Sequence, residues 1–558
     1  MRRILTAAEM REVDRLTAER YTLPSLLLMQ AAANASAREI ASLLSNDLRR
    51  KSILILCGRG NNGGDGAALA RSLCNAGASV TLVLFGRAED TKGDARTNFE
   101  AARSLNGFVD DSPTLTYPLQ FIECVDERVW VDCRWAWTHD CDVIVDALFG
   151  TGLTRPLEGV FRSVVEHLER VRAGREQSAP CRRPLLVSLD LPSGLDADSN
   201  APNGPAVRAD VTVTFTAPKV ANVLPPASHF NGRLVVADIG SPRALFDEAR
   251  SQLFLVEAED ARGWLKKTRY TPESYKNTHG HALVVAGSRG MTGAAVLAAG
   301  AAMSAGAGLV TLAAPESAVP AIAARLMPEV MTAALAETEA GGVSFEAAGR
   351  LGELLGRANV LAVGPGLTGH ESTRRFVREA VGRRRTPVVL DADGLNALAP
   401  WPVELRGTRE APVVLTPHEG EMLRLLGASD PAALADRARV VAEFAAAHQL
   451  FVVLKGTRTM VAAPDGRVFV NPTGNAGLGT AGSGDTLTGV IAGFLAQEFA
   501  AGGVEPDALA AVLAAVYVAG LAGDLAAREL GMRTMVASDV RRHLSAAVRA
   551  LDPEGETP

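Results

Sequence analysis

The sequence predicts two α/β domains in succession, each built on a mainly parallel sheet. With 558 residues, the chain is too long for one hydrophobic core, so two or three domains are expected. Short apolar runs rich in β-branched residues alternate with helix-length segments, which is typical of parallel strands covered by helices on both faces. The alternation breaks near residue 250 and then restarts. We therefore place the domains at residues 1–245 and 255–548.

The first domain begins with an amphipathic helical lead-in over residues 1–45. Two later stretches, Arg128–Asp140 with its three tryptophans and Arg170–Arg183, are interpreted as irregular surface excursions. The expected strands are Ser52–Cys57, Val80–Phe85, Asp142–Asp146, Leu185–Asp190, Val211–Phe215 and Leu234–Asp238.

The second domain repeats the alternation and adds a hairpin. The hairpin pairs Thr459–Ala463 with Val468–Asn471 around a Pro-Asp-Gly turn. The uncharged run Gly290–Pro315 is long enough to span a membrane, but its many glycines and alanines favour a helix packed against a sheet. The other expected strands are His281–Ala286, Leu309–Ala313, Val360–Val363, Val388–Leu390, Val413–Leu415 and Phe451–Leu454.

Composition narrows the class of protein. A net charge of −6 and short arginine clusters such as Arg182-Arg183 do not indicate nucleic-acid binding. The six cysteines form no C-x-x-C pair, and charged residues interrupt the N-terminus where a signal peptide would be apolar. We expect a cytoplasmic homo-oligomer that acts on small molecules, with no nucleic-acid or membrane partner.

A first glycine loop, Asn61-Asn62-Gly63-Gly64-Asp65-Gly66, joins a strand to a helix. Backbone N–H groups at such a turn can hold an anion. Polar turns also follow two other strands, and strand ends of a parallel sheet converge on one crevice, so oxygens of Asn62, Asp146 and Ser193 could bind a hard cation. The alternative is three polar turns that cap helices and never meet; the residues alone favour neither.

Four motifs of the first domain resemble the NAD(P)H-hydrate epimerase domain: Asn61–Gly66, Asp146–Gly152, Asp190–Gly194 and Phe215–Lys219. The resemblance implies a Rossmann-like three-layer α/β/α fold and interconversion of R and S forms of NADHX and NADPHX at C6. It also implies that Asp190 is the catalytic acid/base and that potassium lies on Asn62, Asp146 and Ser193. The implied substrate contacts are Asn61, Asn62, Gly63, Gly64, Asp65, Gly150, Thr151, Gly152, Leu153, Thr154, Arg155, Pro156 and Asp190.

A second glycine loop, Gly474–Asp485, begins a helix of the second domain. An anion hole with Asp485 at its lip suits phosphoryl transfer, because the carboxylate can accept the proton of an attacking hydroxyl. The alternative is a simple N-cap made by Ser483 and Asp485. Other glycine-rich or polar turns follow strands upstream, at Gly287–Ala295, Gly364–Leu367, Asp391–Asn396, Thr416–Glu421 and Lys455–Thr457.

These motifs resemble the NAD(P)H-hydrate dehydratase of the ribokinase-like superfamily, over residues 260–545. The resemblance implies that S-NAD(P)HX is phosphorylated on its C6 hydroxyl, with Asp485 as catalytic base, and then loses phosphate. We expect ADP with Mg²⁺ as donor rather than ATP, because the fused arrangement resembles the bacterial type. Two departures stand out: Glu419 replaces a usual proline, and Ser483 a usual threonine. Implied substrate contacts are Ala294, Ala295, Gly366, His418 and Asp485; implied ADP contacts are Lys455, Gly456, Thr457, Arg458, Thr459 and Gly484.

Two rival functions remain at this point. The second domain could be a kinase for a small alcohol, since the superfamily shares the Gly-x-Gly-Asp lip; a kinase would accumulate a phosphorylated product, whereas a dehydratase releases inorganic phosphate. The first domain could be a non-catalytic binding module. Such a module could dispense with Asp65, Asp146 and Asp190, yet all three are present.

Overall fold

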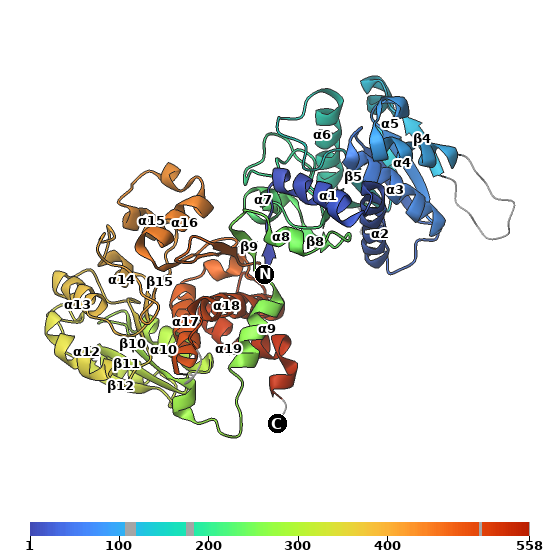
Figure 1. Cartoon of the computed structure of the whole chain (residues 1–558). Helices are drawn as coiled ribbons and strands as arrows, with labels where there is room; N and C mark the ends of the chain where they lie inside the picture. The colour runs from blue at the N-terminus through green and yellow to red at the C-terminus, as the bar shows by residue number, and fades with distance from the viewer. Residues whose placement is uncertain (107–118, 175–183, 501–504, 557–558) are drawn as a thin grey trace. The chain divides into compact units, whose positions relative to one another are not determined.

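The computed structural model describes residues 1–106, 119–174, 184–500 and 505–556 (Figure 1). The chain divides into two compact units. The N-terminal unit comprises residues 2–251, and the C-terminal unit comprises Gln252–Pro558 together with Met1.

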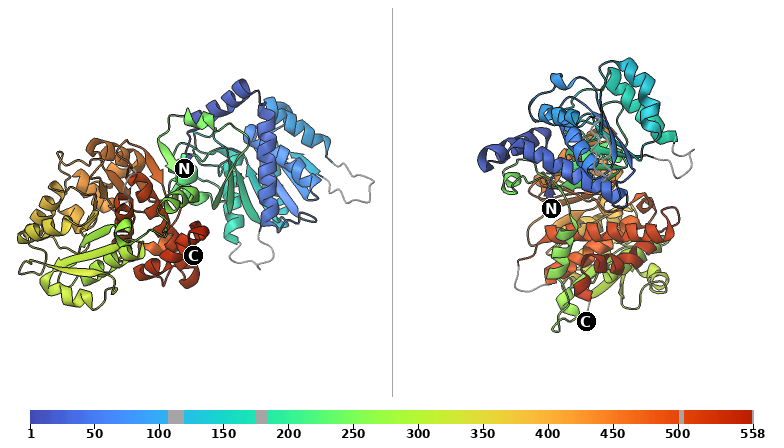
Figure 2. Two further views of the ribbon diagram at one scale, coloured as in Figure 1. Left: turned by 60° about the horizontal axis from the view of Figure 1, so that its bottom comes forward. Right: turned by 90° about the vertical axis from the view of Figure 1, so that its right-hand side faces the viewer.

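The N-terminal unit is a three-layer α/β/α sandwich around a parallel seven-stranded sheet in the order β4-β3-β2-β5-β6-β7-β8. Alternate residues of β2 face opposite layers, as a strand requires: Ile53 packs with residues of α2, α3 and α4, and Leu54 with residues of α5 and α6. Helices therefore cover both faces of the sheet (Figure 2). The seven strands of the sheet are β2 (Ser52–Cys57), β3 (Ser79–Leu84), β4 (Leu119–Glu123), β5 (Val143–Ala147), β6 (Leu185–Leu189), β7 (Val211–Phe215) and β8 (Arg233–Ala237); the two-residue strand β1 (Arg2–Arg3) is not part of it.

The helices of this unit confirm the lead-in and correct one expectation. They are α1 (Ala7–Tyr21), α2 (Ser25–Leu43), α3 (Asn61–Asn75), α4 (Gly93–Ser104), α5 (Glu127–His139), α6 (Gly159–Gly174), α7 (Val220–Val223) and α8 (Ala244–Asp247).

The interpretation of Arg128–Asp140 as an irregular excursion is wrong, because this stretch forms α5. Asp126 caps the helix, and Trp130 is fully buried with its ring 5.5 Å from that of Phe85. Trp130 and Trp137 are two helical turns apart and pack against each other, so these tryptophans form the inner face of a helix. The start of the other stretch, up to Gly174, belongs to α6; residues 175–183, with Cys181 and Arg182-Arg183, lie outside the described residues.

The C-terminal unit is built on a sheet that runs in the order β9-β18-β17-β16-β15-β14-β13-β10-β11-β12. Pairing is parallel except at β16–β17 and β17–β18, the expected hairpin region. The edge strand β12 and the short strand β9 were not expected. The strands are β9 (Leu253–Leu255), β10 (His281–Val285), β11 (Leu309–Pro315), β12 (Met331–Leu335), β13 (Val360–Val363), β14 (Val388–Leu390), β15 (Val413–Leu415), β16 (Phe451–Leu454), β17 (Met460–Ala462) and β18 (Val468–Val470).

The largest core of this unit lies where α10 and α17 pack against each other and against β10. A Cβ at Gly489 would lie 2.1 Å from the carbonyl oxygen of Ala298, so the two helices touch only because this position is glycine. Part of the run Gly290–Pro315 is thus confirmed as a closely packed helix, and the rest forms β11.

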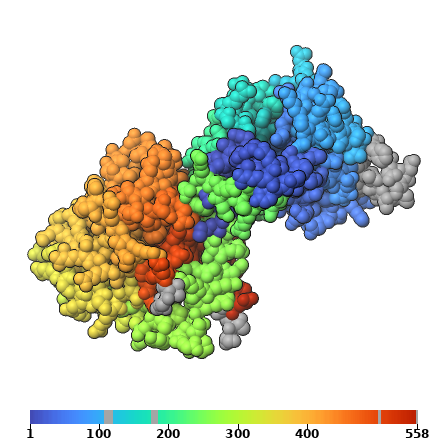
Figure 3. Space-filling model, in the orientation of Figure 1, coloured from blue at the N-terminus to red at the C-terminus, as the bar shows by residue number. Residues whose placement is uncertain are grey.

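Helices α9, α18 and α19 contribute to the same core, whereas α15 and α16 lie at the surface of this unit (orange in Figure 3). One helix of the described residues, α18, is long and apolar enough to cross a membrane, but 67% of that apolar stretch is buried within the fold. The helices are α9 (Ala258–Lys267), α10 (Thr292–Ser304), α11 (Val319–Ala323), α12 (Ala348–Leu355), α13 (Glu371–Gly382), α14 (Asp393–Asn396), α15 (Glu419–Leu426), α16 (Arg437–His448), α17 (Ser483–Ala500), α18 (Ala508–Leu530) and α19 (Ala537–Leu551).

Candidate active sites

The first glycine loop forms the start of α3, directly after β2. A Cβ at Gly63 would lie 1.8 Å from the carbonyl oxygen of Gly58, and one at Gly66 would lie 2.8 Å from the Cβ of Ala147 on β5. Because these positions are glycines, the loop can pack closely against the ends of two neighbouring strands. Asn62 is buried there, and neither its amide oxygen nor its amide nitrogen has a hydrogen-bond partner.

Asp146 at the end of β5 is joined to the turn that follows β6. Its buried carboxylate accepts hydrogen bonds from Ser188 Oγ at 2.8 Å, Ser193 N at 2.8 Å and Ser193 Oγ at 2.5 Å. Burial raises the pKa of Asp146, although the Ser193 and Ser188 donors offset part of the effect. Ser193 Oγ also accepts the N–H of Phe149 at 3.0 Å. Two of the three expected cation ligands are therefore in direct contact.

Asp190, the expected acid/base, forms an ion pair with a buried lysine. Lys219 Nζ lies 2.5 Å from Asp190 Oδ1 and also donates to Thr214 Oγ1 at 2.9 Å and to the carbonyl of Phe215 at 3.1 Å. Asp190 has a φ of 63°, a conformation rare for a non-glycine residue and frequent at functional turns.

The other oxygen of Asp190 faces Gly150. A Cβ at Gly150 would lie 2.9 Å from Asp190 Oδ2 and 3.5 Å from Asn62 Oδ1, so the absence of a side chain leaves open the space between them. In the expected contact segment that continues from Gly150, Thr151 is half-buried and Leu153 is buried, whereas Gly152, Thr154, Arg155 and Pro156 are exposed. The loop, the turn and the acid thus meet at one place and do not form three separate caps.

Two more carboxyl groups interact with this acid. Burial raises the pKa of Asp65 strongly, and the charges of Asp190 and Asp14 add to the effect. Burial likewise raises the pKa of Asp14 to about 6, with Lys219 opposing the rise. Asp14 lies on α1, and its Oδ1 is buried without a partner. Sequence reasoning missed Asp14, because nothing in the polar pattern of an amphipathic helix distinguishes it.

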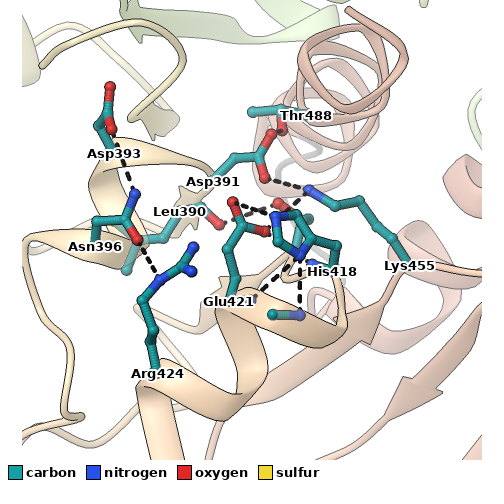
Figure 4. Close-up of polar contacts among 11 residues, drawn as sticks. Leu390, Asp391, Asp393, Asn396, His418, Glu421, Arg424, Lys455 and Thr488 are labelled. Carbon is teal, nitrogen blue, oxygen red and sulfur yellow. Dashed lines mark hydrogen bonds and ion pairs between the residues drawn. The ribbon is translucent and has the colours of Figure 1, made fainter. Parts of the chain in front are cut away.

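The second glycine loop leads into α17, with Asp485 in its first turn. Burial raises the pKa of Asp485 to about 6; Asp391 and Asp393 contribute to the rise, whereas Lys455 opposes it. Lys455 Nζ lies 2.6 Å from Asp391 Oδ1, and Thr488 Oγ1 donates to Asp391 Oδ2 at 2.9 Å (Figure 4). A Cβ at Gly484 would lie 3.4 Å from both Lys455 Nζ and Asp391 Oδ2. The lysine amine therefore lies at the start of α17.

His418 caps α15 at the same edge of the sheet. Its Nδ1 accepts the backbone N–H groups of Gly420 at 3.0 Å and Glu421 at 3.3 Å, and the backbone N–H of His418 donates to the Glu421 carboxylate at 2.8 Å (Figure 4). The His418 side chain is 55% exposed, so a ligand can reach its imidazole ring. Glu419, in place of the usual proline, pairs with Arg437 at 2.6 Å and begins the helix.

The other expected contacts are those for the substrate and those for ADP. A Cβ at Gly366 would lie 3.2 Å from that of Ala294, so these two residues adjoin, whereas Ala295 is buried and faces Gly287. In the expected ADP segment, Gly456 and Thr457 are exposed, and Thr459 Oγ1 donates to the carbonyl of Gly456 at 3.3 Å. Arg458 points inward and donates to the carbonyl of Pro472 at 3.0 Å.

Asp524 of α18 is a further residue that sequence reasoning missed. Its two carboxylate oxygens accept Gly474 N at 2.9 Å and Asn475 Nδ2 at 3.0 Å. Asn475 in turn accepts the N–H of Gly477 at 2.9 Å. Asp524 therefore fixes the upstream half of the second glycine loop. No motif contains it, because the contact joins the loop to a helix that is distant in sequence.

Comparisons with known proteins match both units. The family described as NAD(P)H-hydrate dehydratase matches residues 282–545, and the family described as YjeF-related protein N-terminus matches residues 25–221. A bifunctional NAD(P)H-hydrate repair enzyme of Moorella thermoacetica is 42% identical over 99% of this chain and 98% of its own. One of Thermofilum pendens is 37% identical over 100% of this chain and 98% of its own. A crystal structure of the ADP/ATP-dependent NAD(P)H-hydrate dehydratase of Bacillus subtilis with ATP/Mg²⁺ is 33% identical, covering 54% of this chain and 99% of that one, with a TM-score of 0.45.

Proposed function

The chain belongs to the family of bifunctional NAD(P)H-hydrate repair enzymes, and we propose that its two units perform the two steps of that repair. The N-terminal unit interconverts R- and S-NAD(P)HX at C6, and the C-terminal unit dehydrates the S form to NAD(P)H. One observation supports the presence of two separate active sites most strongly. Each unit has a glycine loop at the start of a helix, an aspartate close to that loop and a lysine bound in an ion pair.

In the N-terminal unit, Asp190 is the proposed acid/base. Epimerisation requires the C6 hydroxyl to gain a proton as it leaves and the returning oxygen to lose one, and a carboxyl within hydrogen-bond reach can do both. The cradle between Asp190, Asn62 and Gly150 would receive the ring. Asn61–Asp65 and Gly150–Pro156 are proposed to hold the rest of the substrate.

The same crevice fits a potassium ion. The amide oxygen of Asn62 is buried without a partner, and Asp146 with Ser193 supplies further oxygens. These three residues are proposed to hold the ion, since potassium binds carboxylate, amide and hydroxyl oxygens. A bound cation would neutralise the buried charge of Asp146 and hold the turn before Gly150 in place.

In the C-terminal unit, Asp485 is the proposed base. It takes the proton of the C6 hydroxyl as that oxygen attacks the terminal phosphate of the donor. The phosphate ester then leaves as inorganic phosphate, with the N1 lone pair assisting, and loss of a C5 proton restores the dihydronicotinamide. Ala294, Ala295, Gly366 and His418 are proposed substrate contacts. The donor is proposed to be ADP with Mg²⁺, giving AMP, on Lys455, Gly456, Thr457, Arg458, Thr459 and Gly484.

The test is to incubate the full-length protein with mixed R and S hydrates and follow the absorbance of the dihydronicotinamide. With ADP or ATP, Mg²⁺ and K⁺ present, both epimers should be consumed and one phosphate should be released per turnover. The nucleotide product identifies the donor, since ADP gives AMP and ATP gives ADP. A phosphorylated product that persists would instead indicate a small-alcohol kinase. If the R form were consumed no faster than R and S interconvert without enzyme, the N-terminal unit would be a binding module. Replacing K⁺ by tetramethylammonium should slow epimerisation alone. A cytoplasmic location and a homo-oligomeric state remain predictions.

A further inference from the structure

Asp391 joins two elements of the C-terminal unit through its two oxygens. Its Oδ1 accepts from Lys455 Nζ at 2.6 Å, after β16, and its Oδ2 accepts from Thr488 Oγ1 at 2.9 Å, in α17 (Figure 4). The Asp391 side chain is 2% exposed, and Thr488 is fully buried. Thr488 lies three residues after Asp485, so both project from the same side of α17. Because each oxygen of the carboxylate accepts one of these hydrogen bonds, rotation of the Asp391 side chain would break at least one of them.

Lys455 depends on this carboxylate for its position. Its amine lies beside Gly484, in the first turn of α17, where the N-terminus of the helix favours an anion. A second carboxylate, that of Glu421, lies 3.6 Å from the amine and is itself paired with His418. A lysine has a long, flexible stem, so without Asp391 its amine would be free to turn toward Glu421 or the solvent.

We propose that Asp391 is a positioning residue for phosphoryl transfer, which holds Lys455 at the start of α17 where the transferred phosphate must lie. This inference rests on the proposed dehydratase function. Asp391 need not touch substrate or nucleotide to act in this way, because its effect passes through Lys455. The alternative is that the buried pair only stabilises the fold, and the two roles predict different kinetics.

The pH profile separates these roles. The charged groups that act on Asp485 are Asp391, Asp393 and Lys455; Glu421 lies 3.6 Å from the lysine and 3.5 Å from His418. Asp391 raises the pKa of Asp485 and Lys455 lowers it. Lys455→Met should therefore move the acid limb of kcat/KM for dehydration to higher pH. Asp391→Asn should move the limb to lower pH by less when Lys455 is present than when it is Met, because a displaced Lys455 no longer lowers the pKa of Asp485. If Lys455 kept its place without Asp391, the shift would be the same in both backgrounds.

A double-mutant cycle on the full-length enzyme tests the proposal directly. With S-hydrate and varied ADP·Mg²⁺, Asp391→Asn should lower kcat/KM for the donor about tenfold or more, mainly through KM, and should cost nothing further once Lys455 is Met. Thr488→Val, which keeps every charge, should give a smaller loss of the same kind. Asp393→Asn is the matched control, since among the described residues the Asp393 carboxylate accepts from Thr368 N and Asn396 Nδ2 and pairs with no lysine; its donor KM should stay within about twofold.

The outcomes distinguish the inference from the function beneath it. Additive losses in the double variant, or equal shifts of the acid limb with and without Lys455, would overturn the positioning role in an enzyme that is otherwise active. Failure of the unsubstituted protein to dehydrate S-hydrate with either nucleotide would overturn the proposed function, and the inference with it. If Asp391→Asn does not fold, the kinetics of Thr488→Val and Lys455→Met decide: an unchanged donor KM in both contradicts the proposal.

Discussion

The two sites use similar residues but place the lysine differently. In the N-terminal unit, Lys219 pairs directly with Asp190, the expected acid/base. In the C-terminal unit, Lys455 pairs instead with Asp391, while the expected base Asp485 has a pKa raised to about 6. Each lysine comes after a strand of a mainly parallel sheet, so the fold alone does not decide which carboxylate it neutralises.

This difference matches what each reaction requires. Epimerisation must give a proton to the departing C6 hydroxyl and take one from the returning oxygen, and beside its ion pair the N-terminal site holds two further carboxyl groups with raised pKa, Asp65 and Asp14. Phosphorylation of a hydroxyl requires only a base, and a carboxylate with a pKa near 6 is ionised at neutral pH yet still basic enough to accept a proton. The predictions below test whether the sites differ in this way.

The largest effect is expected from Asp190→Ala. Removing the carboxyl beside Lys219 should abolish accelerated exchange between R- and S-NAD(P)HX, while dehydration of pure S-hydrate continues at its normal rate. Chromatographic separation of the epimers over time, without nucleotide, measures the exchange. Loss of both activities in parallel would mean that the two units do not work independently.

Asp485→Asn should produce the converse result. Asparagine cannot accept the hydroxyl proton, so dehydration should fall by about two to four orders of magnitude, the usual loss for a general base. Phosphate release from S-hydrate and nucleotide measures this rate, with epimer exchange in the same preparation as the internal control. A near-normal rate would show that Asp485 is only part of a helix cap.

Local signals predicted the frame of both sites, and distant contacts supplied the rest. The apolar runs of β2, β7 and β13 and the glycine loops are visible in the sequence because each depends on neighbouring residues. Edge strands β4 and β12 were missed because their partly exposed residues do not form an apolar run. The pairing of Lys219 with Asp190, the approach of Asp14 and the anchoring of Gly474 by Asp524 all join elements far apart in the chain, so no local pattern could reveal them.

The pH dependence of dehydration should reflect the raised pKa of Asp485. The base must be ionised to act, so kcat/KM for S-hydrate should fall as pH drops through about 6, by about tenfold per pH unit below it. Initial rates in a series of buffers at constant ionic strength give the profile. A limb near the ordinary carboxyl pKa of 3.8 would show that burial and Asp391 do not act on this group as the structure indicates.

The smallest effect is on stability, and its sign is opposite to the effect on activity. The pKa of Asp485 is about 6 in the folded chain and near 3.8 when unfolded, so the folded state binds the proton more tightly and loses stability as pH rises between these values. Asp485→Asn removes that cost. The variant should be more stable above pH 6 by about 1–3 kcal/mol, and the gain should vanish below about pH 4. Thermal unfolding measures it, in the transition that ADP shifts upward. A gain that persisted at pH 4 would come from packing and not from charge. The contrast with the N-terminal site, in which the lysine pairs with the expected acid/base itself, would then not rest on a raised pKa of Asp485.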